Sequence, residues 1–367
     1  MPFEGAYHLS TLTVNLAENS YDIVVECGAL ASLGQRCVSI GLKGIAAVIS
    51  NSTVTPLYGH TVRESLLAAG FSVEMIEIPD GEEYKNSATL NQVYNDLLKA
   101  GVDRSSFIVA LGGGVVGDLA GYAAATWMRG VPFVQVPTTL LAQVDSSVGG
   151  KTGIDHPNGK NLIGAFYQPR LVLIDVATLL TLDKRHFCAG LGEVIKYGVA
   201  LDSSFFEYID ANIEAIMSMD LDTLIEVVLR CCQLKAQVVE LDEKEAGLRT
   251  VLNYGHTLGH AFEAIGDYRG LVHGEAVAIG MILAAKVSVA KELCSPEDFA
   301  KISALIVRCG LSVKIPDFDR KLLLSTVAAD KKSKSGSITF ICNKGIGMYS
   351  MSHHTPDELL KLSGLEA

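Results

Sequence analysis

The first half of the chain alternates short apolar runs with amphipathic stretches. Runs rich in Val, Ile, Leu and Phe predict buried strands at residues 45–49, 73–78, 107–111, 133–137 and 171–174. Between some of them, apolar residues recur at helical spacing, which predicts helices at 56–69 and 87–100. A strand pair at 11–16 and 21–27 opens the chain around a short polar turn. This alternation predicts a mostly parallel sheet covered by helices.

The second half has a longer period and few strand signals. We expect helices there at residues 184–200, 203–218, 220–241, 251–264 and 274–293. Residues 337–341 and 347–351 form an exception and predict a small hairpin near the end. The pattern therefore predicts an α/β domain over residues 1–178 and a mostly α-helical domain over 179–367.

Composition limits the possible functions. The chain has 367 residues, 49% of them hydrophobic, which is enough for two cores. Its formal net charge of −11 argues against general binding to nucleic acid or to an anionic membrane. The eight cysteines lack paired metal-type spacing, so we expect free thiols in a reducing compartment. No Lys or Arg precedes Arg36 and the apolar run 276–285 is too short to span a bilayer, which predicts a cytoplasmic protein.

A glycine-rich segment follows the predicted strand at 107–111. Gly112, Gly114 and Gly117 give the spacing that lets backbone N–H groups approach a pyrophosphate at a helix N-terminus. No acidic residue occurs between Asp118 and Asp145, so the carboxylate of an ordinary Rossmann motif is missing. Alternatively, the glycines only allow close packing of strand and helix. The charged loop at 79–85 favours the nucleotide interpretation, because its side chains suit ribose and phosphate.

Two lysines lie in the next glycine-rich segments. Lys151 follows Gly149-Gly150, and Lys160 follows Gly159. On flexible backbone they suggest a clamp for an anion, although two solvated surface lysines would look the same. A P-loop is excluded because Asp145 stands where that motif requires glycine.

Histidines and one carboxylate predict a metal site in the helical half. His256 and His260 are four residues apart on one helical turn, and His273 follows shortly. A catalytic zinc site needs three protein ligands and one open position. Glu193 is the best further candidate, because it lies in a largely apolar helical segment. Hydrogen-bonded structural roles remain the alternative for each group, and spacing alone leaves the choice among the histidines open.

A polar stripe accompanies these histidines. Arg249, Asn253, His256 and His260 are spaced by four, three and four residues, which predicts one face of a single helix. Such a face is either solvated or suited to a polyhydroxylated anion. Further polar side chains recur on helical faces that we expect to point inward: Lys196, Lys235 and Glu245.

The motifs together resemble the 3-dehydroquinate synthase family. The resemblance rests on GGGVVGDLAG, VPTTLLAQVDSSVGGKTGIDHPNGKNLIGAFYQP, GLGEVIKYG, LNYGHTLGHAFE and HGEAVAIGM, and runs from about residue 80 to 281. It implies an N-terminal Rossmann-like, mostly parallel sheet domain that binds NAD. An all-α, mostly helical C-terminal domain that binds metal and substrate would follow. It also implies a homodimer.

The resemblance also assigns residues. Its metal ligands, for Zn²⁺ or Co²⁺, are Glu193, His256 and His273. Its NAD contacts are Asp80, Gly81, Glu82, Glu83, Tyr84, Lys85, Gly114, Val115, Val116, Gly117, Asp118, Thr138, Thr139, Lys151, Lys160, Thr178, Leu179, Leu180 and Thr181. Its catalytic groups are Lys151, Lys196, Lys235, Glu245, Arg249, Asn253 and His260. Its other substrate contacts are Asp145, Asn161, Arg129 from the second subunit, and Lys331 or Lys332.

The implied reaction converts 3-deoxy-D-arabino-heptulosonate 7-phosphate to 3-dehydroquinate and inorganic phosphate. It would proceed by transient oxidation with NAD, β-elimination of phosphate, re-reduction, ring opening and an intramolecular aldol step. The place of this reaction is the shikimate pathway of aromatic amino-acid biosynthesis. The alternatives are another sugar-phosphate cyclase, a metal-dependent polyol or alcohol dehydrogenase, and a catalytically silent NAD-binding protein.

Overall fold

The computed structural model of the protein describes residues 10–266, 270–328, 333–334 and 337–365. Contacts divide these residues into two compact units. The first contains the residues up to Leu182 together with Leu224–Lys244, and the second contains Asp183–Thr223 and the residues from Glu245 onward. Lys235 therefore belongs to the first unit, because the chain returns to that unit at Leu224–Lys244. A single boundary at residue 178 does not include this return.

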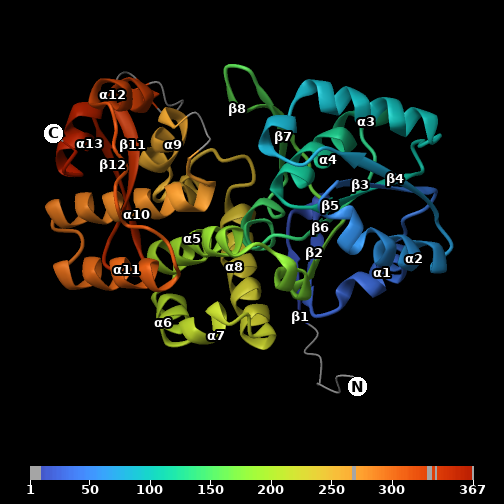
Figure 1. Cartoon of the computed structure of the whole chain (residues 1–367), viewed down its shortest axis with the longest axis horizontal. Helices are drawn as coiled ribbons and strands as arrows, with labels where there is room; N and C mark the ends of the chain where they lie inside the picture. Colours follow the sequence, from blue (N-terminus) through green and yellow to red (C-terminus); the bar gives the residue numbers. More distant parts are fainter. Residues whose placement is uncertain (1–9, 267–269, 329–332, 335–336, 366–367) are drawn as a thin grey trace. The chain divides into compact units, whose positions relative to one another are not determined.

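A seven-stranded sheet forms the centre of the first unit, in the order β1-β2-β9-β6-β5-β3-β4 (Figure 1). Only β1 and β2 pair antiparallel; the other neighbours pair in parallel. The strands are β1 (Ser10–Val14), β2 (Tyr21–Glu26), β3 (Ile45–Asn51), β4 (Ser72–Ile78), β5 (Phe107–Gly112), β6 (Phe133–Pro137) and β9 (Leu171–Asp175). Each predicted strand of this half is present, and the mostly parallel sheet is confirmed.

Helices cover both faces of this sheet. Figure 1 shows α3 and α4 on one side and α1 and α2 on the other. Alternate residues of one strand serve the two cores: Val48 of β3 packs with α1 and α2, whereas Ile49 packs with α3 and α4. These helices are α1 (Leu33–Ser39), α2 (His60–Ala68), α3 (Ser87–Lys99) and α4 (Gly114–Thr126).

Further elements complete the first unit. The long helix α8 (Leu221–Leu241) belongs to it from Leu224 onward. The strands β7 (Lys151–His156) and β8 (Gly159–Phe166) form an antiparallel hairpin. The prediction of flexible loops at Lys151 and Lys160 was therefore wrong, because both residues lie in paired strands. Short helical turns connect the strands: η1 (Ala17–Asn19), η2 (Ala29–Ser32), η3 (Thr55–Gly59), η4 (Glu82–Tyr84), η5 (Trp127–Arg129), η6 (Ala142–Ser146) and η7 (Val176–Thr181).

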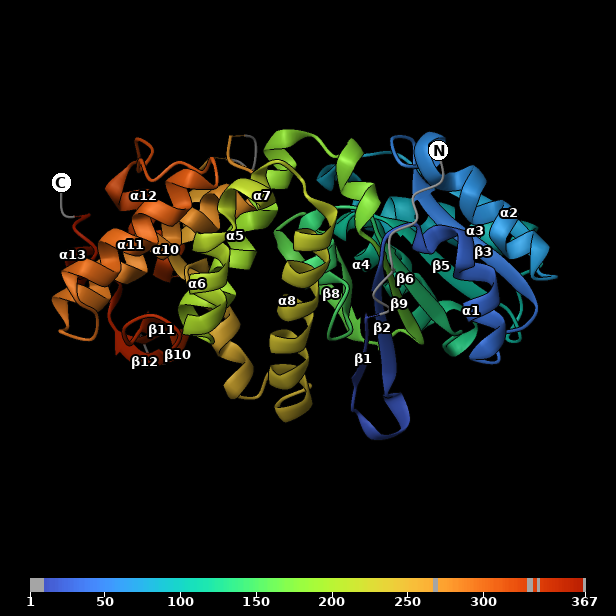
Figure 2. The same cartoon turned by 90° about the horizontal axis from the view of Figure 1, so that it is seen from below.

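The second unit is mainly helical, as expected. Its helices are α5 (Lys184–Ala200), α6 (Ser203–Ala211), α7 (Ile213–Met217), η8 (Leu248–Asn253), α9 (His256–Ile265), α10 (His273–Ala290), α11 (Pro296–Arg308), α12 (Arg320–Ala328) and α13 (Pro356–Leu362). Figure 2 shows a small sheet at one edge of this unit, made of β10 (Ser333–Lys334), β11 (Ser337–Asn343) and β12 (Tyr349–His354). The hairpin expected near the C-terminus is the pair β11–β12.

The core helix α10 is long and apolar enough, by composition, to cross a membrane. Inside this fold 72% of its apolar window is buried, which is the pattern of a core helix in a folded domain. All eight cysteines are free, as predicted, and most are buried. Burial raises the pKa of Cys37 and of Cys232 to about 12, so these thiols are inert at neutral pH.

Candidate active site

Two glycine contacts bring the predicted metal ligands together in the second unit. A Cβ atom on Gly274 would lie 1.8 Å from the carbonyl oxygen of Ala189, so α5 and α10 cross at van der Waals contact of their backbones. A Cβ atom on Gly280 would likewise lie 1.8 Å from the carbonyl oxygen of Gly255, just before α9. Small residues at these positions allow three helices to converge, so their polar side chains share one small volume.

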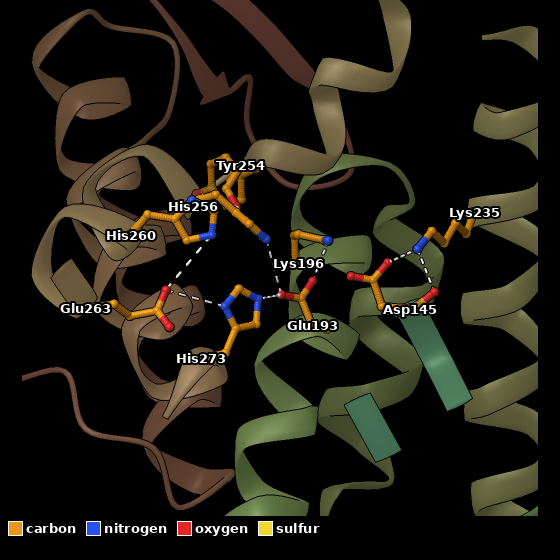
Figure 3. A network of polar contacts seen from close by, with 9 residues as sticks. All are labelled: Asp145, Glu193, Lys196, Lys235, Tyr254, His256, His260, Glu263 and His273. Carbon is orange, nitrogen blue, oxygen red and sulfur yellow. Dashed lines mark hydrogen bonds and ion pairs between the residues drawn. The ribbon is translucent and has the colours of Figure 1, made fainter. Parts of the chain in front are cut away.

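Glu193, His256 and His273 converge at that point (Figure 3). Glu193 Oε1 lies 3.4 Å from His256 Nε2 and 3.3 Å from His273 Nε2. Zinc holds nitrogen and oxygen ligands at about 2.0–2.2 Å, so neighbouring ligand atoms of a tetrahedral site lie about 3.3–3.6 Å apart. The donor types and their separations therefore fit a divalent metal of zinc type.

His260 belongs to the same cluster. The ligand atoms of His256, His260 and His273 all lie within 4.8 Å of one another. The His260 side chain is 50% exposed, whereas that of His256 is 10% exposed. The Nε2 atom of His260 lies 3.9 Å from Glu263 Oε2. The geometry brings all three histidines together and leaves His260 the most accessible of them.

The surroundings give the two inner histidines different proton affinities. Burial lowers the pKa of His256 well below its usual range, and its Nδ1 atom lies 3.1 Å from the Tyr254 carbonyl oxygen. A neutral ring that donates from Nδ1 keeps its Nε2 lone pair for a metal. Burial alone would also lower the pKa of His273, but the carboxylates of Glu193 and Glu263 raise it to about 10. Without a metal, a proton on His273 compensates part of the buried negative charge.

Two buried cations belong to the same unit. Lys196 is 1% exposed and its Nζ atom pairs with Glu193 Oε2, one helical turn away on α5. Arg249 is also 1% exposed, and Asn253 Nδ2 donates to Glu245 Oε1 at 3.3 Å. Such groups provide charge and hydrogen bonds for an anionic, hydroxylated ligand.

The prediction of one helical face through Arg249, Asn253, His256 and His260 was wrong. Arg249 and Asn253 lie in the short 3-10 helix η8, and α9 begins only at His256. Gly255 separates the two elements with a φ of 79°, a left-handed conformation that favours glycine and interrupts the helix. The four residues nevertheless all belong to the second unit, on two elements instead of one.

The first unit has a reversal of strand order at the carboxyl ends of its parallel strands. From β3 the chain moves outward to β4 and then back to β5 on the other side of β3, so the strand order reverses there. Ligands of α/β sheets bind at such a reversal. The glycine loop lies there, between β5 and α4. Gly117 also packs against Gln135, because a Cβ atom on it would lie 2.8 Å from Gln135 Oε1. The glycines therefore serve close packing, and the start of α4 still provides backbone N–H groups at this end of the sheet.

Asp80 lies at this end of the sheet. Its carboxylate accepts hydrogen bonds from Asn51 Nδ2 and from Thr53 Oγ1, both at 2.7 Å. Asn51 is the last residue of β3. Two donors therefore hold one carboxylate in place near the reversal of strand order. Asn51 was not among the predicted NAD contacts, although its position at a strand end was a usable signal.

Lys85 connects three segments of the first unit. It is 4% exposed, and its Nζ atom donates to Asp118 Oδ2 and to Asn161 Oδ1, both at 2.6 Å. Burial opposes the charged form, but Asp118 and Glu82 outweigh it and raise the pKa of Lys85. Lys160 Nζ lies 3.6 Å from Glu82 Oε1. The charged loop at 79–85 is thus joined to α4 and to the β7–β8 hairpin.

Lys235 of α8 pairs with Asp145 (Figure 3). Its Nζ atom also donates to the Asp145 carbonyl oxygen at 2.6 Å, and the lysine is 6% exposed. Gln143 Nε2 donates to Thr178 Oγ1 at 3.0 Å, which fixes the start of the segment Thr178, Leu179, Leu180 and Thr181. Thr138 is buried and follows β6, next to Thr139.

The remaining predicted residues lie at the surface or outside the described residues. Arg129 is exposed, and its φ of 67° places it in a left-handed turn beside Met128. Lys151 begins β7 and is exposed. Lys331 and Lys332 lie outside the described residues.

Family models match most of the chain. The N-terminal model of 3-dehydroquinate synthase matches residues 75–189, and the C-terminal model matches residues 190–333. A 3-dehydroquinate synthase of Pelobacter propionicus is 63% identical over 358 residues, which cover 98% of this chain and 100% of that protein. The chain belongs to the 3-dehydroquinate synthase family. It is accordingly an enzyme of the shikimate pathway.

Solved structures of related cyclases have the same fold. A 2-deoxy-scyllo-inosose synthase, complexed with carbaglucose-6-phosphate, NAD⁺ and Co²⁺, matches with a TM-score of 0.87 and 27% identity over 96% of this chain and 98% of that chain. A 2-epi-5-epi-valiolone synthase from Streptomyces hygroscopicus subsp. jinggangensis, with NAD⁺ and Zn²⁺ bound, matches with a TM-score of 0.86 and 27% identity over 95% of this chain and 97% of that chain. The two-part architecture predicted for the family is confirmed.

Proposed function

We propose that this chain forms 3-dehydroquinate from 3-deoxy-D-arabino-heptulosonate 7-phosphate, using NAD and one divalent metal held by Glu193, His256 and His273. The main support is the convergence of these three side chains at tetrahedral ligand spacing. It occurs in a chain that is 63% identical to a 3-dehydroquinate synthase. Two related cyclases of the same fold have NAD⁺ together with Zn²⁺ or Co²⁺ bound.

The two bound groups divide the chemistry. NAD supplies a reversible hydride acceptor, and the metal supplies a Lewis acid for the substrate hydroxyls. The protein contributes position and charge. Asp80 and Lys85 are suited to the ribose and phosphate groups of NAD, because both are fixed at the carboxyl end of the sheet.

Buried cations would bind the anionic ends of the substrate. Arg249 and Lys196 are each 1% exposed, so a phosphate or carboxylate that reaches them gains strong charge-assisted hydrogen bonds. Lys151 and Asn161 serve the same purpose from the β7–β8 hairpin, together with Lys331 or Lys332. In a buried environment of low dielectric such interactions are stronger than in water.

His260 is the proposed proton-transfer group. It is half exposed, adjoins the two histidine ligands and is reachable from solvent. As a fourth metal ligand it would block the open position that a substrate needs. Lys235, Glu245 and Asn253 would orient hydroxyls, and the departing phosphate would accept the proton during elimination.

One assay tests the reaction. Purified protein is given the heptulosonate phosphate, Zn²⁺ and a catalytic amount of NAD, and both inorganic phosphate and NADH are followed. Phosphate release without accumulated NADH supports the proposal, because the hydride returns to the substrate. Stoichiometric NADH would instead indicate a dehydrogenase, and neither product would indicate a silent binding protein. Identification of the carbocycle separates 3-dehydroquinate from the products of other cyclases.

We also propose a cytoplasmic homodimer in which Arg129 reaches the substrate of the second subunit. Its support is the exposure of this arginine on a left-handed turn, together with the family membership. Light scattering gives the mass in solution. Mixed dimers test the reach of Arg129: Arg129→Ala chains combined with chains inactivated at His273 should recover part of the activity.

A further inference from the structure

Glu263 is a buried carboxylate that the proposed function leaves without a role. It is 5% exposed and lies in α9, beside the buried apolar residues Ala261 and Phe262. A carboxylate in such surroundings is costly unless it has a polar or charged partner. Its surroundings therefore indicate its role.

Two imidazoles face the same oxygen of Glu263. Its Oε2 atom lies 3.5 Å from His273 Nδ1 and 3.9 Å from His260 Nε2 (Figure 3). The other nitrogen of His273, Nε2, lies 3.3 Å from Glu193. Each ring nitrogen of His273 thus faces a different carboxylate. Of the two carboxylates, Glu193 also faces His256.

We propose that Glu263 is a positioning residue that accepts a hydrogen bond from the Nδ1–H group of His273 and so holds Nε2 as the metal ligand. This inference rests on the proposed metal site. A histidine ligand is fixed in tautomer and orientation by the group that binds its other nitrogen, and a carboxylate there also makes the ring a stronger donor. The same carboxylate oxygen holds the exposed ring of His260 beside the site.

The two histidine ligands are therefore supported differently. His256 Nδ1 faces the Tyr254 carbonyl oxygen, a neutral group of the backbone. His273 Nδ1 faces a charged side chain, which a single substitution neutralises. Glu263→Gln keeps the size of the side chain and removes its charge, so it tests the contribution of the carboxylate to metal binding.

The matched control is Glu275→Gln. Glu275 lies two residues from His273 in α10, but its carboxylate pairs with Arg185 at 2.7 Å and accepts the Val272 amide at 3.0 Å. Glutamine can still accept that amide, so the helix start is kept. This variant removes the same charge close to His273 without touching an imidazole.

Competition with a chromophoric chelator measures Zn²⁺ affinity in the three full-length proteins. We expect affinity about 10–100-fold weaker in Glu263→Gln, the usual effect of removing an outer partner of a ligand. Glu275→Gln should match the wild type. Equal affinity in Glu263→Gln and wild type would overturn the inference. A wild type that binds no Zn²⁺ would instead overturn the metal site of the proposed function, so the two failures are distinguishable.

A second measurement needs no variant and holds even if Glu263→Gln does not fold. Long-range ¹H–¹⁵N correlation spectra of the Zn²⁺-loaded wild type report which nitrogen of each histidine carries a proton. His273 should show a protonated Nδ1 and a metal-bound Nε2. A metal-bound Nδ1 on His273 would overturn the inference, because Nδ1 would then carry no N–H group to donate to Glu263.

Discussion

The two units of the chain place buried charges by different means. In the first unit, Lys85 comes from a loop after β4 and Asp118 comes from α4, at the carboxyl end of a parallel sheet. In the second, Glu193, His256 and His273 come from three helices whose backbones touch at glycines. The carboxyl end of a parallel sheet brings together side chains from consecutive β/α turns. Short motifs in the sequence therefore predict such a site. A crossing of helices brings together residues that are far apart in the sequence. Their placement depends on close contact between the helix backbones.

The helix crossing carries the larger functional consequence, so its loss should have the largest effect. His273→Ala removes one of three proposed ligands, and we expect metal-dependent turnover to fall about 1,000-fold or more, since a catalytic metal contributes several kcal/mol. Zinc content and steady-state activity measure it. His186→Ala, on the exposed face of α5, is the control and should behave like wild type. Normal zinc content in His273→Ala would remove this residue from the ligand set.

The next prediction concerns the crossing itself. In Gly274→Ala the new methyl would lie 1.8 Å from the Ala189 carbonyl oxygen, so α5 and α10 must separate. We expect a loss of about 3 kcal/mol of unfolding free energy, typical of severe overpacking. Zinc affinity should fall too, because Glu193 moves away from His273. Thermal unfolding of the metal-free protein checks the first effect and chelator competition the second.

Gly270→Ala provides the comparison for that variant. A Cβ atom on Gly270 meets nothing within 4 Å, so its substitution should leave stability and zinc affinity close to wild type. If both glycine variants behaved alike, close backbone contact would not be what places the ligands.

Much of this division was predictable from the sequence. The strands and the glycine loop of the first unit have short local signals, and they were found in place. The donor types of the metal cluster were also predictable, but spacing could not choose among His256, His260 and His273. The contact of Glu193 with two of them depends on the crossing of α5, α9 and α10, which no local pattern encodes.

The errors have physical causes. Helical periodicity ran on through residues 251–264, because a 3-10 turn and an α-helix have similar spacings, and the left-handed Gly255 between them was overlooked. Glycine and lysine at residues 149–160 suggested a loop, although a glycine there allows close pairing of strands: a Cβ atom on Gly153 would lie 2.5 Å from the Ile163 carbonyl oxygen. Glu263 was not predicted as a site residue, because its only signal in the sequence is its place three residues from His260 in an apolar segment.

At the carboxyl end of the sheet, we expect substitution of Lys85 to reduce stability less than Gly274→Ala does. Lys85→Met leaves Asp118 without its nearest cation in a mostly buried position, where the Asp118 side chain is 19% exposed. Breaking a buried pair in this way costs about 3–5 kcal/mol when burial is complete, so we expect about 2 kcal/mol here. The thermal midpoint should fall, and the KM for NAD should rise, because Lys85 also holds Asn161 and the loop at 79–85.

Lys99→Met is the control for that substitution. Its lysine pairs with Asp96 at 2.9 Å but is 75% exposed, so its loss should change stability by less than about 0.5 kcal/mol. Equal midpoints for the two variants would show that the Lys85 pair contributes no more than a surface pair.

The smallest expected effect belongs to the ion pair at the start of α10. The hydrogen bond from Arg185 holds the pKa of Glu275 below its usual range, with a backbone hydrogen bond from Val272 adding to it. Because the folded-state pKa is lower than that of the unfolded chain, about 4.3, the pair stabilises the protein above that pH and the contribution is lost as pH falls through the lower value. Arg185 is 53% exposed, so Glu275→Gln should cost less than about 1 kcal/mol at pH 7. Denaturation curves between pH 7 and about pH 3 should show the difference from wild type shrinking to zero on the acid side. A difference that persists at the lowest pH would assign the effect to packing at the helix start. The start of α10 would then be stabilised by van der Waals contact, as at Gly274, and not by the ion pair.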